Sequence, residues 1–290
     1  MRAHTIRSTM KRTDSNRGRT YTAPDGTELW SVTTKLNVVA KPQLIAWAAK
    51  MERELVLEAA TDLWKDAPKT LSPASFKLIL EQRLGAKKAH QKESERAANI
   101  GTLVHDAIER ELRISLKQPV GPPPELGPEA ALALSKWKEW EKEREFEPLF
   151  IEQQVFSLVH GYAGTLDMIA RYTRADGKRV LALVDWKTSS GIYAEYLLQI
   201  GAYHGAIREM GHFENEELDG LIVKIPKTSG KEEIRIVEIP HAAIVEKYLP
   251  GFLRVNALFD VMKGLEGDPF LAAPKKPRKQ KAKATNTEVK

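Results

Sequence analysis

The chain has 290 residues, 42% of them hydrophobic, and no cysteine. A chain of this length can bury most of its apolar surface in one large or two modest domains. It lacks the apolar run of roughly 18 to 20 residues that a membrane-spanning helix requires, so we expect a cytoplasmic protein with no membrane partner. The absence of cysteine excludes disulfides, iron–sulfur clusters and cysteine nucleophiles, so any metal must be held by oxygen or histidine ligands.

The net charge of +6 is concentrated at the two ends of the sequence. Residues 274–290 carry seven Lys or Arg against Glu288, and residues 1–19 carry six against Asp14, which leaves the middle of the chain at −5. We expect 1–19 and 270–290 to be basic disordered tails, because their composition is too polar to pack. Such tails either bind phosphate backbones non-specifically or only aid solubility, and the acid-poor start also resembles an organellar transit peptide.

The first half of the chain is predicted to be mainly helical. A Pro-Asp-Gly turn within residues 21–30 predicts a short hairpin. The proline-rich residues 115–128 form a loop that no helix or strand could cross. Apolar residues recur at helical spacing elsewhere, and the predicted helices span residues 42–64, 72–84, 86–112 and 129–145.

From residue 149 onward the apolar residues alternate as they do in strands. The predicted elements are an antiparallel meander of strands at 149–159, 162–172 and 178–187, a helix at 193–210, strands at 218–226 and 232–240 around a turn at 228–230, and a helix at 241–263. This order predicts an α/β fold with a central mixed β-sheet flanked by helices. An N-terminal hairpin and helical region, 20–97, would precede a core at 98–265.

Charged residues follow an apolar strand at the end of the meander. Asp185 and Lys187 are two residues apart, so both side chains leave the same face of the strand, whereas Trp186 points to the other. Asp167 lies within the preceding strand. Two carboxylates on adjacent strands raise each other's pKa unless a cation lies between them, and such oxygen ligands favour Mg²⁺ or Mn²⁺.

A bare Asp-x-Lys arises by chance in a chain of this composition. Asp176-Gly177-Lys178 has the same spacing, but its glycine and its position between two strands predict a hairpin turn. An isolated Asp185–Lys187 pair would more often be a structural salt bridge than a site.

Two helices carry polar residues at four-residue spacing, which places them on one helical face. Gly101, His105 and Glu109 share such a face, as do Gln199 and Tyr203 in the later helix. The alternative interpretation of each is structural: a histidine satisfied in the core, and a polar helix edge packed on the sheet.

In order along the chain, these pieces resemble the RecB-like branch of the PD-(D/E)xK nuclease superfamily, including its phage-type members. The resemblance covers residues 98–205 and rests on four motifs: Gly101 with His105, Gly164 with Asp167, Asp185 with Lys187, and Gln199 with Tyr203. It implies a restriction-endonuclease-like core. The chain departs from the many relatives that hold an iron–sulfur cluster on four cysteines.

The resemblance implies a metal-dependent DNA exonuclease of a phage or prophage recombination, replication or repair system, acting in a bacterial or phage-infected host. His105, Asp167, Asp185 and the main-chain carbonyl of Trp186 would hold Mg²⁺ or Mn²⁺, and Lys187 would orient water or offset charge. Gln199 and Tyr203 would contact the substrate. Glu109 and Glu152 are secondary candidates, each with the alternative role of a structural salt-bridge partner.

The implied substrate is linear DNA attacked from its ends, with a single-stranded form one option. A recombination or single-strand-binding protein is the partner that this role suggests. Two other functions remain open: a non-catalytic DNA-binding recombination accessory protein that kept the fold, and a structure- or site-specific endonuclease of the same superfamily.

Overall fold

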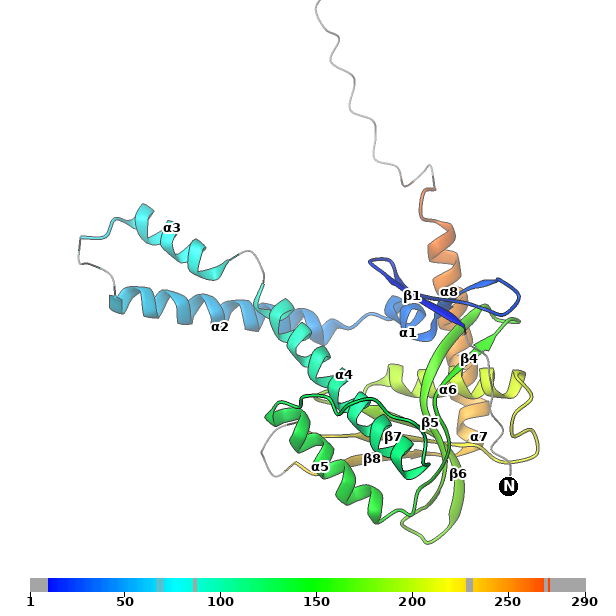
Figure 1. The fold of residues 1–290 in the computed structure, drawn as a ribbon. Coiled ribbons are helices and arrows are strands. Elements are labelled where there is room, and N and C mark those ends of the chain that lie inside the picture. The colour runs from blue at the N-terminus through cyan, green and yellow to red at the C-terminus, as the bar shows by residue number, and fades with distance from the viewer. Residues whose placement is uncertain are drawn as a thin grey trace, which may run out of the picture.

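The computed structural model describes residues 10–66, 68, 70–85, 88–227, 232–268 and 271. It is an α/β fold in which helices cover both faces of one mixed sheet (Figure 1). The strands are β1 (Lys11–Ser15), β2 (Gly18–Thr22), β3 (Glu28–Ser31), β4 (Glu147–Ser157), β5 (Tyr162–Thr173), β6 (Arg179–Lys187), β7 (Asp219–Lys224) and β8 (Arg235–Ile239). The helices are α1 (Val32–Lys35), η1 (Leu36–Val38), α2 (Pro42–Asp66), α3 (Pro73–Leu84), α4 (Ala89–Ser115), α5 (Pro128–Lys142), α6 (Ala194–Glu209), α7 (His241–Ala243), the π-helical η2 (Ile244–Tyr248) and α8 (Leu249–Gly264).

The central strand, β5, pairs with three others. The sheet runs β1-β2-β3-β5-β6-β7-β8, and β4 lies antiparallel along the other edge of β5. β3 pairs in parallel with the start of β5 at Tyr162, and β6 pairs antiparallel with its second half from Met168 onward. The predicted β4–β5–β6 meander is therefore confirmed, and the parallel β6–β7 pair makes the sheet mixed.

Alternating side chains on β6 divide the core between the two faces of the sheet. Leu181 and Leu183 pack with apolar residues of α6 and α8, whereas Val184 and Trp186 pack with α4 and α5. This burial on both faces explains why the sequence of β6 contains a continuous apolar run. It also fixes the direction of Asp185, which follows the residues that face α6.

The N-terminal part of the chain is joined to the sheet more closely than the sequence suggested. Residues 11–22 form the β1–β2 hairpin, so the expected disorder is wrong for the part of 1–19 that the structure describes. Tyr21 of this hairpin is buried with Leu29, which explains why the hairpin is ordered. The division expected between residues 97 and 98 falls inside α4, with no break in the helix. Residues 1–9, 272–290 and the turn at 228–230 lie outside the described residues.

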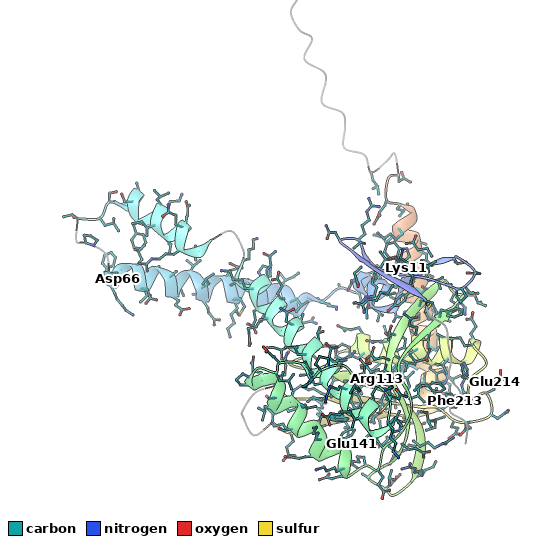
Figure 2. The ribbon with its side chains drawn as sticks, viewed as in Figure 1. Lys11, Asp66, Arg113, Glu141, Phe213 and Glu214 are labelled. Atoms are coloured by element: carbon teal, nitrogen blue, oxygen red, sulfur yellow. The ribbon has the colours of Figure 1, made fainter. Side chains whose placement is uncertain are left out.

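Helices α2 and α3 extend away from the sheet as an arm. Leu63 is the only residue of the described part of this helix pair that is buried, and Figure 2 shows Asp66 at the far end, away from the sheet. α4 connects the arm to the sheet, where its last turns pack on β5 and β6. Across the described residues, no helix combines the length and the hydropathy needed to cross a bilayer.

Candidate metal and nucleic-acid site

Asp167 and Asp185 lie opposite each other where β6 separates from β5. The β5–β6 ladder ends at the Met168–Val184 pair, and continuing its register places Asp167 beside Asp185. At that point the main-chain N–H of Trp186 donates to Asp167 Oδ2 at 2.7 Å. The separation of the two strands therefore provides both the space and a backbone donor for the Asp167 carboxylate.

Glu152 faces the same point from β4, where that strand is irregular. Its φ of 48° lies in the left-handed region, which costs a non-glycine residue on the order of 1–3 kcal/mol. Residues five apart in a regular strand lie on opposite faces, yet Phe150 and Val155 pack in the same apolar cluster. On β5, Leu166 and Ile169 lie on either side of Asp167. They are three residues apart, and they also share that cluster. Both carboxyl groups thus lie where their strands break the regular alternation.

His105 joins these two carboxyl groups from α4. Its Nδ1 lies 3.6 Å from Asp167 Oδ1. His105, Glu152 and Asp167 each offer one potential metal-ligand atom, and these three atoms lie within 4.8 Å of one another. Within the described ranges, no other three His or acidic side chains come as close together. The His105 side chain is 29% exposed and that of Asp167 13%, so solvent reaches the group.

A hydrogen-bonded network encloses Asp185 next to this group. Lys187 Nζ lies 2.7 Å from Asp185 Oδ2 and donates to Gln199 Oε1 at 3.1 Å. Gln199 Nε2 donates to Asp185 Oδ1 at 3.0 Å and to the Tyr203 hydroxyl at 3.3 Å. Gly164 permits the close approach of Tyr203, because a Cβ at that position would lie 2.5 Å from the tyrosine ring. Two turns of α6 are thereby fixed against the end of β6.

The pKa values of two carboxyl groups in the site are raised. Burial raises the pKa of Glu152 to about 8, and the nearby Asp167 and Glu109 add to the shift. Burial likewise raises the pKa of Asp185 to about 6, because it outweighs the attraction of Lys187. Glu152 is therefore mainly protonated at neutral pH when no cation is bound, whereas a divalent cation would favour its ionised form.

The pKa values of the other three ionisable groups, Asp167, His105 and Lys187, are shifted in the direction that favours their charged forms. Burial alone would raise the pKa of Asp167, but His105, Lys187 and the Trp186 N–H together lower it. Burial alone would lower the pKa of His105 and of Lys187, yet the pKa of His105 is raised by Asp167, and that of Lys187 by Asp185 and Asp167. Lys187 is consequently a cation at neutral pH, which favours electrostatic stabilisation over a role as general base.

A groove leads from this group towards α2. Two adjoining cavities of about 300 and 670 Å³ share Ala97, Thr188, Ser189 and Lys227 in their walls. His105 and Lys187 line the smaller cavity. Additional aromatic and basic residues line the pair: Trp47, Arg96, Tyr193, Tyr196 and Lys224. Sequence patterns did not group these residues, because they come from α2, α4, α6, the segment that follows β6 and the end of β7.

The sequence-predicted residues are distributed over two adjacent groups. His105 and Asp167 lie in the group with Glu152, whereas Asp185, Lys187, Gln199 and Tyr203 form the enclosed network. Asp185 was expected beside Asp167 as a ligand, but its carboxyl group is 2% exposed and its oxygens contact Lys187 and Gln199. Glu152, only a secondary candidate from the sequence, occupies the more open position.

The remaining candidates have structural contacts. Glu109 pairs with Arg113 on the same helix, in agreement with the salt-bridge alternative. The side chain of Trp186 lies on the opposite face of the sheet against Trp137 and Trp140, and the role of its carbonyl stays a prediction. Asp176 caps the β5–β6 turn by accepting from the main-chain N–H of Lys178, as expected for the second Asp-x-Lys.

Comparisons with known proteins leave the family open. No family model matches the sequence, and no curated protein matches it. Among solved structures, the chain is similar to the one described as "Crystal structure of SSO0001", with 15% identity and a TM-score of 0.26 over 56% of this chain and 74% of that one. A similarity at that level carries no argument about fold or activity.

Proposed function

We propose that this chain is a divalent-metal-dependent deoxyribonuclease with a PD-(D/E)xK-type core, which hydrolyses phosphodiester bonds from DNA ends. The observation that carries the proposal is the group of His105, Glu152 and Asp167 within 4.8 Å of one another, with the partly buried cation Lys187 on the next strand. Clustered carboxyl groups with perturbed pKa values beside a groove are typical of a catalytic site rather than of a surface salt bridge.

The donor set fits Mg²⁺ or Mn²⁺. Two carboxyl groups supply the oxygen ligands that both ions prefer, and an imidazole is acceptable to Mn²⁺. The raised pKa of Glu152 shows that burial and Asp167 disfavour its ionised form, and binding of a cation would favour that form. His105, Glu152 and Asp167 would hold the ion, which supplies a Lewis acid that activates water and offsets phosphate charge.

The protein's own residues would position the substrate. The Lys187 ammonium group lies beside His105 in the wall of the smaller cavity, where it would pair with a phosphate oxygen and offset the charge that develops there. Gln199 holds that ammonium group by accepting from it, so its role is positioning. Trp186 orients Asp167 through its N–H, which leaves Asp167 Oδ1 directed towards His105.

The groove supports a nucleic-acid substrate. Trp47, Tyr193 and Tyr196 provide aromatic faces on which bases can stack, and Lys227 provides positive charge for the backbone. The two cavities share Ala97 and Lys227, and the candidate ligand His105 lines the smaller one. A DNA end entering from α2 would thus bring a phosphodiester to Lys187. A role in phage recombination, replication or repair follows from the resemblance of the sequence motifs.

The second Asp-x-Lys supplies a matched control for a test. The double variant Asp185→Asn with Lys187→Met is expected to lose the release of nucleotides from end-labelled linear DNA in Mg²⁺ or Mn²⁺. The same changes at Asp176 and Lys178, in an exposed turn, are expected to leave the activity unchanged. Digestion by the first variant at the wild-type rate would refute the proposal.

Two alternatives correspond to other outcomes of the same assay. A shift in DNA mobility without cleavage, in either metal, would favour a non-catalytic accessory protein. Cutting of covalently closed circles would favour an endonuclease, because a circle offers no end. Including a circular substrate and an EDTA arm therefore separates all three functions.

A further inference from the structure

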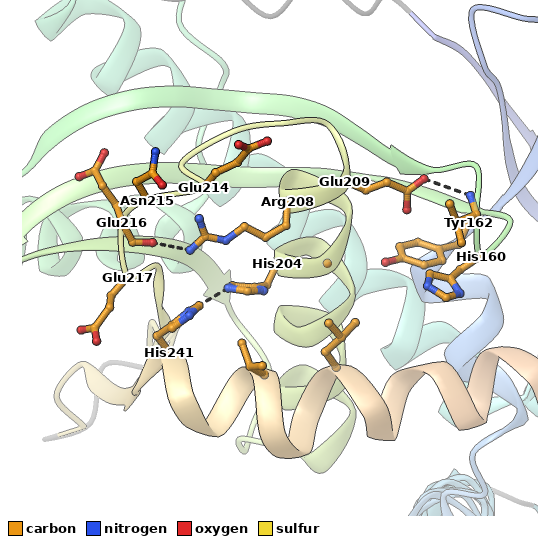
Figure 3. A pocket seen from close by; sticks show the side chains of 14 residues that line it. His160, Tyr162, His204, Arg208, Glu209, Glu214, Asn215, Glu216, Glu217 and His241 are labelled. Atoms are coloured by element: carbon orange, nitrogen blue, oxygen red, sulfur yellow. Dashed lines mark hydrogen bonds between the residues drawn. The ribbon is translucent and has the colours of Figure 1, made fainter.

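A second cavity lies on the far side of α6 from Asp185. It has a volume of about 800 Å³, is open to solvent, and is lined by α6, the segment that follows β4, the α6–β7 loop and the start of α7 (Figure 3). Three histidines, His160, His204 and His241, line it. The proposed nuclease activity uses none of them.

His204 and His241 face each other across the wall of this cavity. His204 Nε2 lies 3.1 Å from His241 Nδ1, and Figure 3 shows the two rings directed at one another. Two imidazoles bound to one tetrahedral zinc ion have nitrogen atoms about 3.3–3.4 Å apart, because each Zn–N bond is about 2.0–2.1 Å. The pair is therefore close to the spacing of two ligands on one ion, whereas a hydrogen bond requires one of the two nitrogens to carry a proton.

The buried histidine has an unsatisfied polar atom. His204 is 2% exposed, and its Nδ1 has no hydrogen-bond partner among the described residues. Nε2 is the ring nitrogen that faces His241, so Nδ1 would carry the ring proton when Nε2 binds a metal. Burial, with the nearby Arg208, lowers the pKa of His204 to about 3, so the ring is neutral at physiological pH. A neutral imidazole has a lone pair available for a metal, which a protonated one lacks.

The charge of the cavity favours a cation. Four glutamates line the cavity, Glu209, Glu214, Glu216 and Glu217, and Arg208 is the only Lys or Arg among its described lining residues. The guanidinium group of Arg208 donates to the main-chain carbonyl of Glu216 and is offset by Glu214 and Glu216. With neutral imidazoles the wall therefore carries a net negative charge, which disfavours an anionic ligand.

We propose that His204 and His241 bind a borderline transition-metal ion of the Zn²⁺ class in this cavity, at a site separate from the candidate nuclease site. No third His or acidic ligand atom among the described residues lies within 4.8 Å of both nitrogens. Water would therefore fill the remaining positions.

Such an ion would link two parts of the fold. His204 follows Tyr203 on α6, the helix that also carries Gln199, whereas His241 lies after β8 at the start of α7. Binding would hold α6 against α7 and would stabilise the helix whose other face contacts Asp185. The inference does not depend on the nuclease proposal, because it concerns different ligands and is read out without DNA.

Equilibrium dialysis of the full chain against Zn²⁺, with metal analysis of the protein, tests the site. His241 is only partly buried, so we expect His241→Ala to fold and to bind about one equivalent of zinc fewer than wild type. His160→Ala is the matched control: it removes an imidazole from the same cavity and should bind as much zinc as wild type. Circular dichroism checks that each variant is folded.

A thermal melt gives an independent readout. Zinc at a hundredfold excess over its dissociation constant should raise the melting temperature by about 5 °C in Asp167→Ala protein, which lacks the candidate nuclease ligand, and should not do so when His241→Ala is added. Zinc binding that His241→Ala leaves unchanged, or that Asp167→Ala alone abolishes, would overturn the proposal. A plain histidine–histidine hydrogen bond would give that result. Loss of nuclease activity alone would not bear on it.

Discussion

Replacing Glu152 with glutamine should stabilise the metal-free protein, although it removes a proposed metal ligand. The carboxyl group is held by a left-handed backbone close to Asp167, and burial raises its pKa from an ordinary 4.5 to about 8. Glutamine has nearly the same shape and cannot ionise. The substitution therefore removes the electrostatic cost and leaves the packing in place.

The sign of the pH dependence follows from the raised pKa. An acid whose folded-state pKa lies above its unfolded value stabilises the fold fully below the unfolded pKa and loses that contribution as pH rises through the folded value. For Glu152 the window is pH 4.5 to about 8. At pH 7.5 the shift corresponds to roughly 4 kcal/mol by linkage. Because the side chain is only partly buried, we expect about half of this, roughly 2 kcal/mol.

Urea unfolding in EDTA at pH 5 and pH 7.5 measures the effect. Glu152→Gln and wild type should have nearly equal free energies of unfolding at pH 5, and the variant should exceed wild type by about 2 kcal/mol at pH 7.5. Adding Mn²⁺ at pH 7.5 should reverse the order, because the ion favours the ionised carboxylate of the wild type. Glu145→Gln is a matched control, because Glu145 also has a positive φ but its side chain is exposed.

A difference between the two proteins that is the same at pH 5 and pH 7.5 would contradict this reasoning. The substitution would then act through packing or backbone strain, and not through ionisation. Equal stabilisation of both proteins by Mn²⁺ would show that Glu152 is not a ligand. The two results are independent, so the pKa shift and the metal role can fail separately.

Three further substitutions test other parts of the fold. Gly201→Ala should destabilise the protein by about 3 kcal/mol or more in urea unfolding, because its Cβ would lie 2.5 Å from the Tyr248 backbone, whereas Gly121→Ala, with open space around it, should change little. Gln199→Leu should cost about 1–3 kcal/mol in the same assay by leaving a buried ion pair without its amide partner, and should lower nuclease activity. Trp186→Ala should cost about 3–5 kcal/mol, and a loss below 1 kcal/mol would contradict its place in the α4–α5 core.

Local patterns were sufficient to predict most of the central sheet. The alternation of residues 149–187 predicted three antiparallel strands, because one apolar face in each strand has to be buried. The predicted loop at 115–128 is confirmed, since α4 ends at Ser115 and α5 begins at Pro128. The β1–β2 hairpin was missed because β1 is exposed throughout, and its order depends on Tyr21 being covered from β5 and β4, which no local pattern encodes.

For the candidate site, sequence spacing identified residues that belong to it, but it predicted less well how those residues are arranged. Asp185 and Lys187 share a face, as the two-residue period requires, and Gln199 and Tyr203 share one by the four-residue period. The prominence of Glu152 could not be predicted, because it results from one left-handed residue in a strand whose sequence contains neither glycine nor asparagine at that point. A long-range register and a single dihedral angle decide which carboxyl group faces His105.

Asp185 and Glu152 have different roles because of the charge of the site. Asp167, Asp185 and Glu152 would repel one another if all three were ionised with only one lysine to offset them. Lys187 offsets the charge of Asp185, and His105 lowers the pKa of Asp167, whereas burial and the neighbouring Asp167 raise the pKa of Glu152 to about 8. A divalent cation is the one addition that would let all three be ionised together. Metal binding at neutral pH should therefore release a proton from Glu152, which titration calorimetry in buffers of different ionisation enthalpy would detect.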